Sequence, residues 1–205
     1  LQLQLVVYMD AAMEMLRGQH PKKEILPGGI LYYHIDDPVL ESDTPLSDEE
    51  AEQALLFALR PDGLVNSGEE IYRAMDQNFE GKSQMIPVEI KKNGEISTAR
   101  SKVASTEEFA VITRYVEHEI RQCGEAIYAG NIAVNPYRSD IETSCTYCPY
   151  ASVCGMDAKI PGYEYRQFAS MKKEEVLDQM QTELARNRGK GERSDEMDEG
   201  TAERH

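Results

Sequence analysis

Three of the four cysteines in the chain, Cys145, Cys148 and Cys154, lie within a stretch of ten residues. Their C-x-x-C-P-x-x-x-x-C spacing lets three thiolates reach one soft metal centre while the backbone between them turns around it. A disulfide between two of them would leave the third thiol unpaired, and no signal peptide directs the chain to an oxidising compartment. We therefore expect a cytoplasmic protein whose thiols bind a metal, and incidental buried thiols in a loop are the alternative.

The number and spacing of the thiols bear on which metal they bind. Zinc ribbons usually contain two C-x-x-C knuckles, and this chain contains one. An iron–sulfur cluster tolerates uneven spacing because its iron corners lie several ångströms apart, so the pattern favours iron and sulfur over zinc. Either centre takes four ligands, and the fourth is either Cys123 or a residue outside this sequence.

Cys123 lies in a helix that the sequence predicts over residues 106–129. A capping box of Ser105 and Glu108 opens this helix and Gly130 closes it. Apolar residues recur along it at helical spacing and predict a face turned toward a core: Phe109, Ile112, Val116, Ile120, Cys123 and Ile127. Because free cysteine is commonly buried, we expect Cys123 to be a packed core residue and the fourth ligand to come from elsewhere.

A second pair of residues that could do chemistry is Gln4 and Tyr8, one turn apart on a helix predicted over residues 1–17. This spacing places an amide beside a phenol, although an ordinary surface contact would look the same. The predicted apolar face of this helix is Leu1, Leu5, Met9, Ala12 and Leu16. Nothing at its start could cap it, so we interpret residue 1 as a truncation point.

The composition narrows the possible classes of protein. The 205 residues are 40% hydrophobic, enough for one domain or a large part of one, and no apolar run approaches the length of a membrane span. A net charge of −15 argues against a simple DNA-binding module, although it leaves room for a local basic channel. The chain also lacks a Gly-x-x-x-x-Gly-Lys phosphate-binding loop.

Turn and capping signals predict the remaining elements. These are a strand over 30–35, helices over 47–60 and 71–79, a hairpin of strands over 84–91 and 95–98, and a final helix over 171–185. The strand over 30–35 has bulky side chains on both faces, which predicts a place inside a sheet. Residues 1–185 are expected to form part of one domain, and the charged, Gly-containing residues 186–205 a disordered tail.

Four segments, between residue 1 and about residue 168, resemble the C-terminal nuclease region of the AddB subunits of bacterial AddAB helicase–nucleases. They are QLVVYMDA at 4–11, with the family's Q-x-x-x-Y pattern, GILYYHI at 29–35, AMD at 74–76, and NPY at 135–137 leading into the cysteine cluster. The cluster alone is shared with iron–sulfur exonucleases of the Cas4 and Dna2 types. The surrounding segments favour the AddB family.

This resemblance implies an α/β, restriction-endonuclease-like fold of the PD-(D/E)xK class. In that class an Asp and a Glu/Asp-x-Lys pair on adjacent strands bind Mg²⁺ and activate water to hydrolyse DNA. The resemblance implies that Gln4 and Tyr8 support the nuclease site, and that Cys145, Cys148 and Cys154 hold a 4Fe–4S cluster. It places the catalytic carboxylates and the fourth cluster cysteine before residue 1, so the fragment alone is expected to be inactive.

The function implied for the intact protein is an ATP-dependent exonuclease that processes DNA double-strand ends for recombinational repair. Its implied partners are DNA and an AddA-type helicase–nuclease subunit, with which it forms a heterodimer. Two alternatives remain open at this point: another iron–sulfur exonuclease of the Cas4 or Dna2 type, and a zinc-stabilised interaction module without catalysis.

Overall fold

The computed structural model describes residues 3–35, 38–77, 79–140 and 142–199. The chain divides into a first unit, Leu1–Glu117, and a second unit, His118–His205. Helix α4 (Thr106–Tyr128) begins in the first unit and ends in the second.

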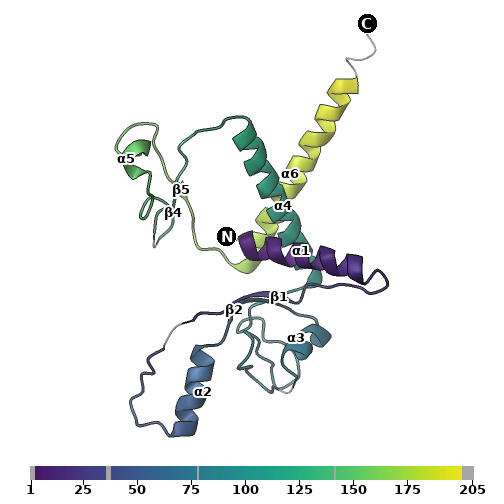
Figure 1. The fold of residues 1–205 in the computed structure, drawn as a ribbon, viewed down its shortest axis with the longest axis vertical. Coiled ribbons are helices and arrows are strands. Elements are labelled where there is room, and N and C mark those ends of the chain that lie inside the picture. The colour runs from purple at the N-terminus through teal and green to yellow at the C-terminus, as the bar shows by residue number, and fades with distance from the viewer. Residues whose placement is uncertain (1–2, 36–37, 78, 141, 200–205) are drawn as a thin grey trace. The chain divides into compact units, whose positions relative to one another are not determined.

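The first unit contains a three-stranded sheet in the order β1-β2-β3. β1 (Gly29–Tyr32) runs antiparallel to β2 (Asp62–Asn66), and β2 runs parallel to β3 (Val103–Ala104). The helices before and between these strands are α1 (Leu3–Gln19), α2 (Asp48–Ala58) and α3 (Glu69–Met75), and Figure 1 shows their order along the chain. The mixed helix-and-sheet composition agrees with the predicted α/β class.

A cluster of buried side chains packs around β2 and β3. It draws its members from both strands, from α3 and from the irregular segment between α3 and β3: Val65, Tyr72, Phe79, Ile86, Val88, Ile90 and Val103. Burial of such side chains contributes about 1.5–3 kcal/mol each relative to exposure. The sheet and α3 therefore form the packed centre of the first unit.

Two helix starts are confirmed by reciprocal capping hydrogen bonds. At α2 the backbone N–H of Glu50 donates to Ser47 Oγ (3.3 Å), and the N–H of Ser47 donates to the Glu50 carboxylate (2.9 Å). The hydrogen bonds that the Glu50 carboxylate accepts from the Ser47 N–H and from the Ser47 hydroxyl lower the pKa of Glu50. At the start of α4 the N–H of Glu108 donates to Ser105 Oγ (3.2 Å), and the N–H of Ser105 donates to the Glu108 carboxylate (2.7 Å). A side-chain cap accounts for about 1 kcal/mol of helix stability.

The sheet differs from the prediction in two respects. Within the described residues β1 pairs with β2 alone and ends at Tyr32, so the strand is shorter than the one predicted over 30–35 and lies at the edge of this sheet rather than inside it. The predicted hairpin over 84–98 has a turn at Gly94, whose φ is +84°, but its arms form single bridges such as Ile90 with Ile96 rather than strands. Bulky side chains on two faces indicate burial, and they do not determine which neighbour a strand pairs with.

Strand β2 has no signal in the sequence, because Asp62 and Gly63 are turn residues. Gly63 has a φ of +147°, and a Cβ atom there would collide with the backbone carbonyl of Ile30 on β1. The absence of a side chain at Gly63 thus permits close approach of the two strands.

Asn66, at the end of β2, joins three segments of the first unit. Its side chain is buried and donates from Nδ2 to the carbonyl oxygen of Pro27 (2.8 Å) and to Thr106 Oγ1 (3.0 Å). Its Oδ1 accepts from the N–H of Gly68 (2.9 Å). One amide therefore fixes the segment before β1, the start of α3 and the start of α4.

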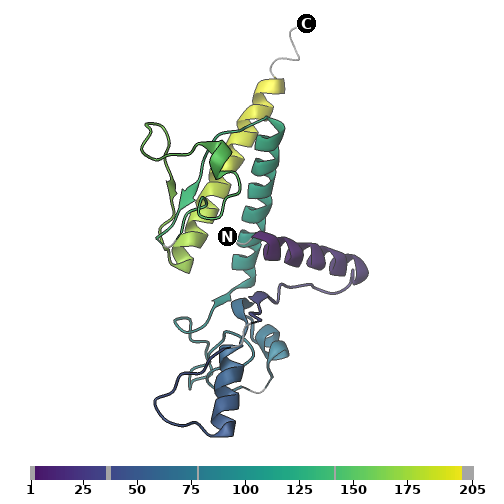
Figure 2. The ribbon, with the colours of Figure 1, turned by 60° about the vertical axis from the view of Figure 1, so that its left-hand side comes forward.

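The second unit contains the end of α4, a small parallel pair of strands, β4 (Tyr137–Arg138) and β5 (Arg166–Gln167), the short helix α5 (Ala151–Cys154) and the helix α6 (Lys173–Glu199). In Figures 1 and 2, α5, β4 and β5 form a small lobe between α4 and α6 in the chain. The rings of Tyr137 and Phe168 meet edge to face in this lobe, with centroids 5.6 Å apart.

Helix α6 continues past residue 185, where the sequence predicts its end, and keeps helical backbone to Glu199. The predicted tail over 186–205 therefore overlaps a helix in part, and residues 200–205 lie outside the described residues. The buried side chains of α6 include Leu177 and Met180. Among the described residues, no helix is both long enough and apolar enough to cross a membrane.

Candidate functional site

Gln4 and Tyr8 meet on the exposed face of α1. The Gln4 Nε2 group donates a hydrogen bond to the Tyr8 hydroxyl oxygen over 2.6 Å, and both side chains are open to solvent. The predicted juxtaposition of amide and phenol is thus confirmed. Because the Tyr8 oxygen accepts from Gln4, its own proton remains available for a second partner such as a phosphate oxygen.

The buried face of α1 is not the predicted stripe. Val6 is the buried residue of the helix, whereas Leu16 is exposed. Apolar residues lie on several faces of this helix, so their spacing alone does not tell which face is buried. The position of Val6 turns Gln4 and Tyr8 outward.

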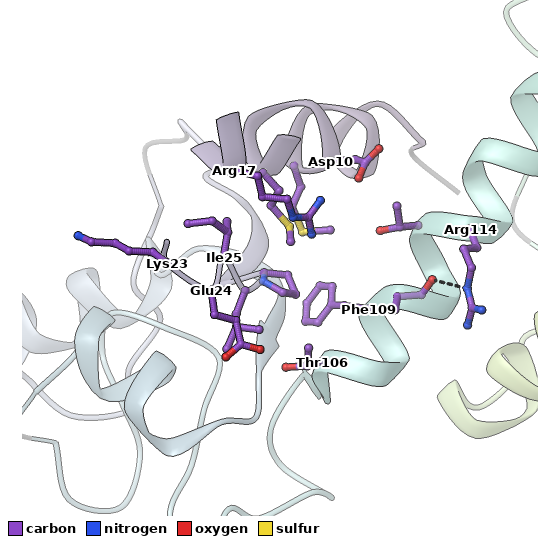
Figure 3. Close-up of a pocket in the computed structure, with 14 residues that line it drawn as sticks. Asp10, Arg17, Lys23, Glu24, Ile25, Thr106, Phe109 and Arg114 are labelled. Carbon is purple, nitrogen blue, oxygen red and sulfur yellow. Dashed lines mark hydrogen bonds between the residues drawn. The ribbon is translucent and has the colours of Figure 1, made fainter. Parts of the chain in front are cut away.

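A hollow of about 540 Å³ lies beside α1 (Figure 3). The first turns of α4 and residues 23–27 complete its walls. Its apolar lining includes Met9, Met13 and the buried Phe109, and charged side chains such as Asp10 and Glu24 stand around it. In Figure 3 the carboxylates of Asp10 and Glu24 lie on opposite sides of the hollow. The sequence analysis did not find this hollow, because its walls come from segments about 90 residues apart in the chain that only the fold places together.

The described residues contain no group of three or more His, Cys, Asp or Glu side chains placed to hold a metal ion. The three clustered cysteines nevertheless share one loop in which they are half-buried free thiols. No carboxylate or histidine interrupts the spacing between them, so the donor set is one of soft sulfur ligands. Such a set fits three of the four ligands of an iron–sulfur cluster.

Local hydrogen bonds explain how the cysteine loop is shaped. The N–H of Cys145 donates to Thr143 Oγ1 (3.2 Å), and the N–H of Cys148 donates back to the carbonyl oxygen of Cys145 (3.3 Å). Cys154 ends α5, and Gly155 follows in the left-handed conformation with a φ of +65°. The backbone thus turns once between Cys145 and Cys148 and again after Cys154.

Tyr165 is a residue of this lobe that the sequence analysis missed. A hydrogen bond to Cys145 raises the pKa of its hydroxyl group. The Arg138 guanidinium lies 4.3 Å from the centre of the Tyr165 ring. The pairing of β4 with β5 brings these positions together, and no local sequence signal would have indicated it.

Cys123 is exposed, and the prediction that it packs in a core is wrong. Early in α4 the predicted apolar face is buried at Phe109 and Val116, but Ile120 is 47% and Ile127 78% exposed. A helical stripe identifies which residues share a face, and it does not tell how far along the helix the core extends.

Comparison with known proteins gives consistent matches. Residues 1–155 match the family model described as the PD-(D/E)XK nuclease superfamily.

Three relatives are named as the B subunit of an ATP-dependent helicase/deoxyribonuclease. One from Thermoanaerobacter sp. (strain X514) is 38% identical over 90% of this chain and 16% of its own length. One from Lachnoclostridium phytofermentans is 37% identical over 99% of this chain and 18% of its own length. One from Clostridium botulinum (strain Hall) is 38% identical over 90% of this chain and 16% of its own length. The chain thus spans less than a fifth of the length of each of these relatives.

Proposed function

The chain belongs to the PD-(D/E)XK nuclease superfamily, and on this premise we propose that it is part of the nuclease subunit of a bacterial helicase–nuclease. The fold class predicted from the sequence is confirmed by the same match. The observation that carries the proposal is the identity of 37–38%, over at least 90% of this chain, to relatives named as helicase/deoxyribonuclease subunits. In the intact complex the subunit degrades DNA at double-strand ends for recombinational repair and works with an AddA-type partner subunit.

Hydrolysis of DNA in this proposal uses Mg²⁺, which would be held by the Asp and the Glu/Asp-x-Lys pair that the family resemblance implies. When bound, the metal supplies charge stabilisation and an activated water. Gln4 and Tyr8 contribute from α1. The Gln4 amide orients the Tyr8 hydroxyl through their 2.6 Å hydrogen bond, and the hydroxyl proton is donated to a phosphate oxygen of the DNA.

Cys145, Cys148 and Cys154 are proposed to hold three corners of a 4Fe–4S cluster. Metal–thiolate bonds of this kind contribute folding energy, because no preformed site exists in the unfolded chain. The cluster would therefore fix the loop between β4 and β5 rather than take part in phosphodiester cleavage. The Tyr165 hydroxyl, which contacts Cys145, would donate to the ligating sulfur.

Metal content after anaerobic purification of the intact subunit tests the cluster. We expect iron and acid-labile sulfide with visible absorption, and both should be lost in Cys148→Ser. The matched control is Cys123→Ser, in which an exposed thiol changes and the absorption should persist. Loss of iron in the control would identify Cys123 as the fourth ligand. Stoichiometric zinc without sulfide in the parent protein would instead support the zinc-stabilised module.

Cleavage of a labelled DNA by the intact complex tests the role of the tyrosine. Tyr8→Phe removes the hydroxyl and keeps the ring, and we expect kcat to fall on the order of 10²-fold, as for loss of one positioned donor. Tyr33→Phe is the control, since Tyr33 is also an exposed tyrosine of the first unit, 61% against 59% for Tyr8. Equal activity of the two variants would contradict a catalytic role for Tyr8.

A further inference from the structure

Most basic residues of the first unit lie in residues 60–102, a segment whose net charge is zero although the whole chain is acidic. Residues 60–102 contain seven Lys or Arg and seven Asp or Glu, so the net charge of −15 lies entirely outside them. Three acids of this segment are engaged by neighbours, in the pairs Asp62–Lys102, Glu89–Arg100 and Asp76–Ser83. Lys102 and Arg100 are thus paired with acids, and the other five cations of the segment are Arg60, Arg73, Lys82, Lys91 and Lys92.

Two of these cations converge on one aromatic ring. The Arg60 guanidinium lies 4.6 Å and the Lys82 ammonium 3.9 Å from the centre of the Phe57 ring. Arg60 is anchored further by donating from Nη1 to the carbonyl oxygen of Ser83 (3.0 Å). Within the described residues neither cation has a carboxylate at ion-pair distance. Two like charges held this way favour an anion beside them. In a nucleic acid the negative charge is carried by the phosphates, so a phosphate is the group that these cations would bind.

A second group of cations surrounds a hollow of about 570 Å³ that begins at Gly81, the residue before Lys82. Arg73, Lys91 and Lys92 line it, and Glu80 is the one acid among the lining residues. Arg73 is held by donating from Nη1 to the carbonyl oxygen of Phe79 (3.0 Å). The Lys91 ammonium lies 3.9 Å from the exposed Glu95, outside the lining, and such exposed pairs contribute at most about 1 kcal/mol. The hollow is therefore positively charged on balance.

We propose that these two groups of cations bind successive phosphates of a DNA strand. Gly81 lines the hollow and Lys82 reaches Phe57, so adjacent residues, with Cα atoms about 3.8 Å apart, connect the two groups. A polyanion can occupy both groups at once, whereas a single small phosphate would occupy one. The inference rests on the proposed function, because it names a surface through which the subunit holds its substrate. It concerns binding, and it assigns these residues no part in cleavage.

The test measures how binding to DNA depends on salt. Phosphate contacts release counterions, so log K falls with log salt by about 0.7 per contact on a single strand and about 0.9 on a duplex. The variant Lys82→Gln/Lys92→Gln is chosen because Arg60 and Arg73 also bond backbone carbonyls and could support the fold. The control, Lys22→Gln/Lys159→Gln, changes the net charge equally at exposed lysines outside the segment.

Fluorescence anisotropy of the 205-residue chain with a labelled strand of about 20 nucleotides, and with the same sequence as a duplex, gives the slopes. We expect the double variant to lower the magnitude of the slope by about 1.4 on the single strand or about 1.8 on the duplex. The DNA on which the change reaches the value expected for two contacts is the form that the surface holds. The control should keep the parent slope.

An unchanged slope in the double variant on both DNAs would overturn the proposal, as would failure of the parent chain to bind either DNA at low salt. If the double variant loses its circular dichroism spectrum, Lys92→Gln alone replaces it, with an expected change of about 0.7 on the single strand. The outcome is separable from the proposed function. Iron content and the Tyr8→Phe effect test the nuclease subunit, and neither depends on the slope.

Discussion

Replacing the buried Asn66 with Ala should strongly destabilise the first unit. The side chain is 1% exposed and makes three hydrogen bonds, to Pro27, Gly68 and Thr106. Each bond contributes about 1 kcal/mol net, and the buried groups left without a partner raise the cost of truncation. We therefore expect the free energy of unfolding to fall by about 3 kcal/mol.

A second variant at the same position separates shape from hydrogen bonding. Asn66→Asp keeps the volume and the acceptor for Gly68, but it turns a carboxylate oxygen toward the carbonyl oxygen of Pro27. The buried charge should make this variant at least as unstable as Asn66→Ala at neutral pH. Because burial raises the pKa of the new carboxyl group above its value in the unfolded chain, the penalty should shrink as the pH falls and the group becomes protonated.

Urea unfolding measures both effects. It is followed by circular dichroism because the chain contains no tryptophan whose fluorescence could report unfolding. With an m value of about 2 kcal/mol/M, a loss of about 3 kcal/mol lowers the midpoint by about 1.5 M. The control is Asn93→Ala, which removes an exposed amide bonded to Glu95 (2.9 Å) and should cost about 0.5 kcal/mol or less. A midpoint for Asn66→Ala within about 0.3 M of the parent would refute the reasoning.

Three further outcomes follow from single positions. Gly63→Ala should lower the free energy of unfolding by more than about 2 kcal/mol in the same urea assay, because the added Cβ meets the carbonyl oxygen of Ile30. Cys123→Ala should change it by less than about 0.5 kcal/mol, since the thiol is exposed; a larger loss would restore the core interpretation. The hydrogen bond from Lys102 lowers the pKa of Asp62 below 3.8, so its stabilisation is present above that pH and is lost as the pH falls through the lowered value. Both side chains are more than half exposed, so Asp62→Asn should cost less than about 1 kcal/mol at neutral pH. This cost should shrink as the pH falls through the lowered pKa of Asp62, and it should shrink in high salt.

The sequence by itself was sufficient for features that depend on near neighbours. The capping boxes at Ser47 and Ser105, the amide–phenol pair of Gln4 and Tyr8, and the turns around the clustered cysteines all involve residues a few positions apart. The energies of such contacts are set by helix and turn geometry, which the order of residues determines directly. The family resemblance was likewise carried by short segments, and the superfamily match over residues 1–155 confirms it.

Only the tertiary structure decided which partners distant segments have. It made β1 an edge strand, paired β2 with β3, exposed Cys123, and brought Lys82 to the ring of Phe57. In each case the sequence showed that a residue is apolar or charged, but burial and pairing depend on which surfaces remain uncovered after the other elements have packed. The free energy gained by hydrophobic burial is proportional to the buried area and has no preferred direction, so it does not specify a partner. The backbone hydrogen bonds and side-chain shapes of the whole unit select the partner.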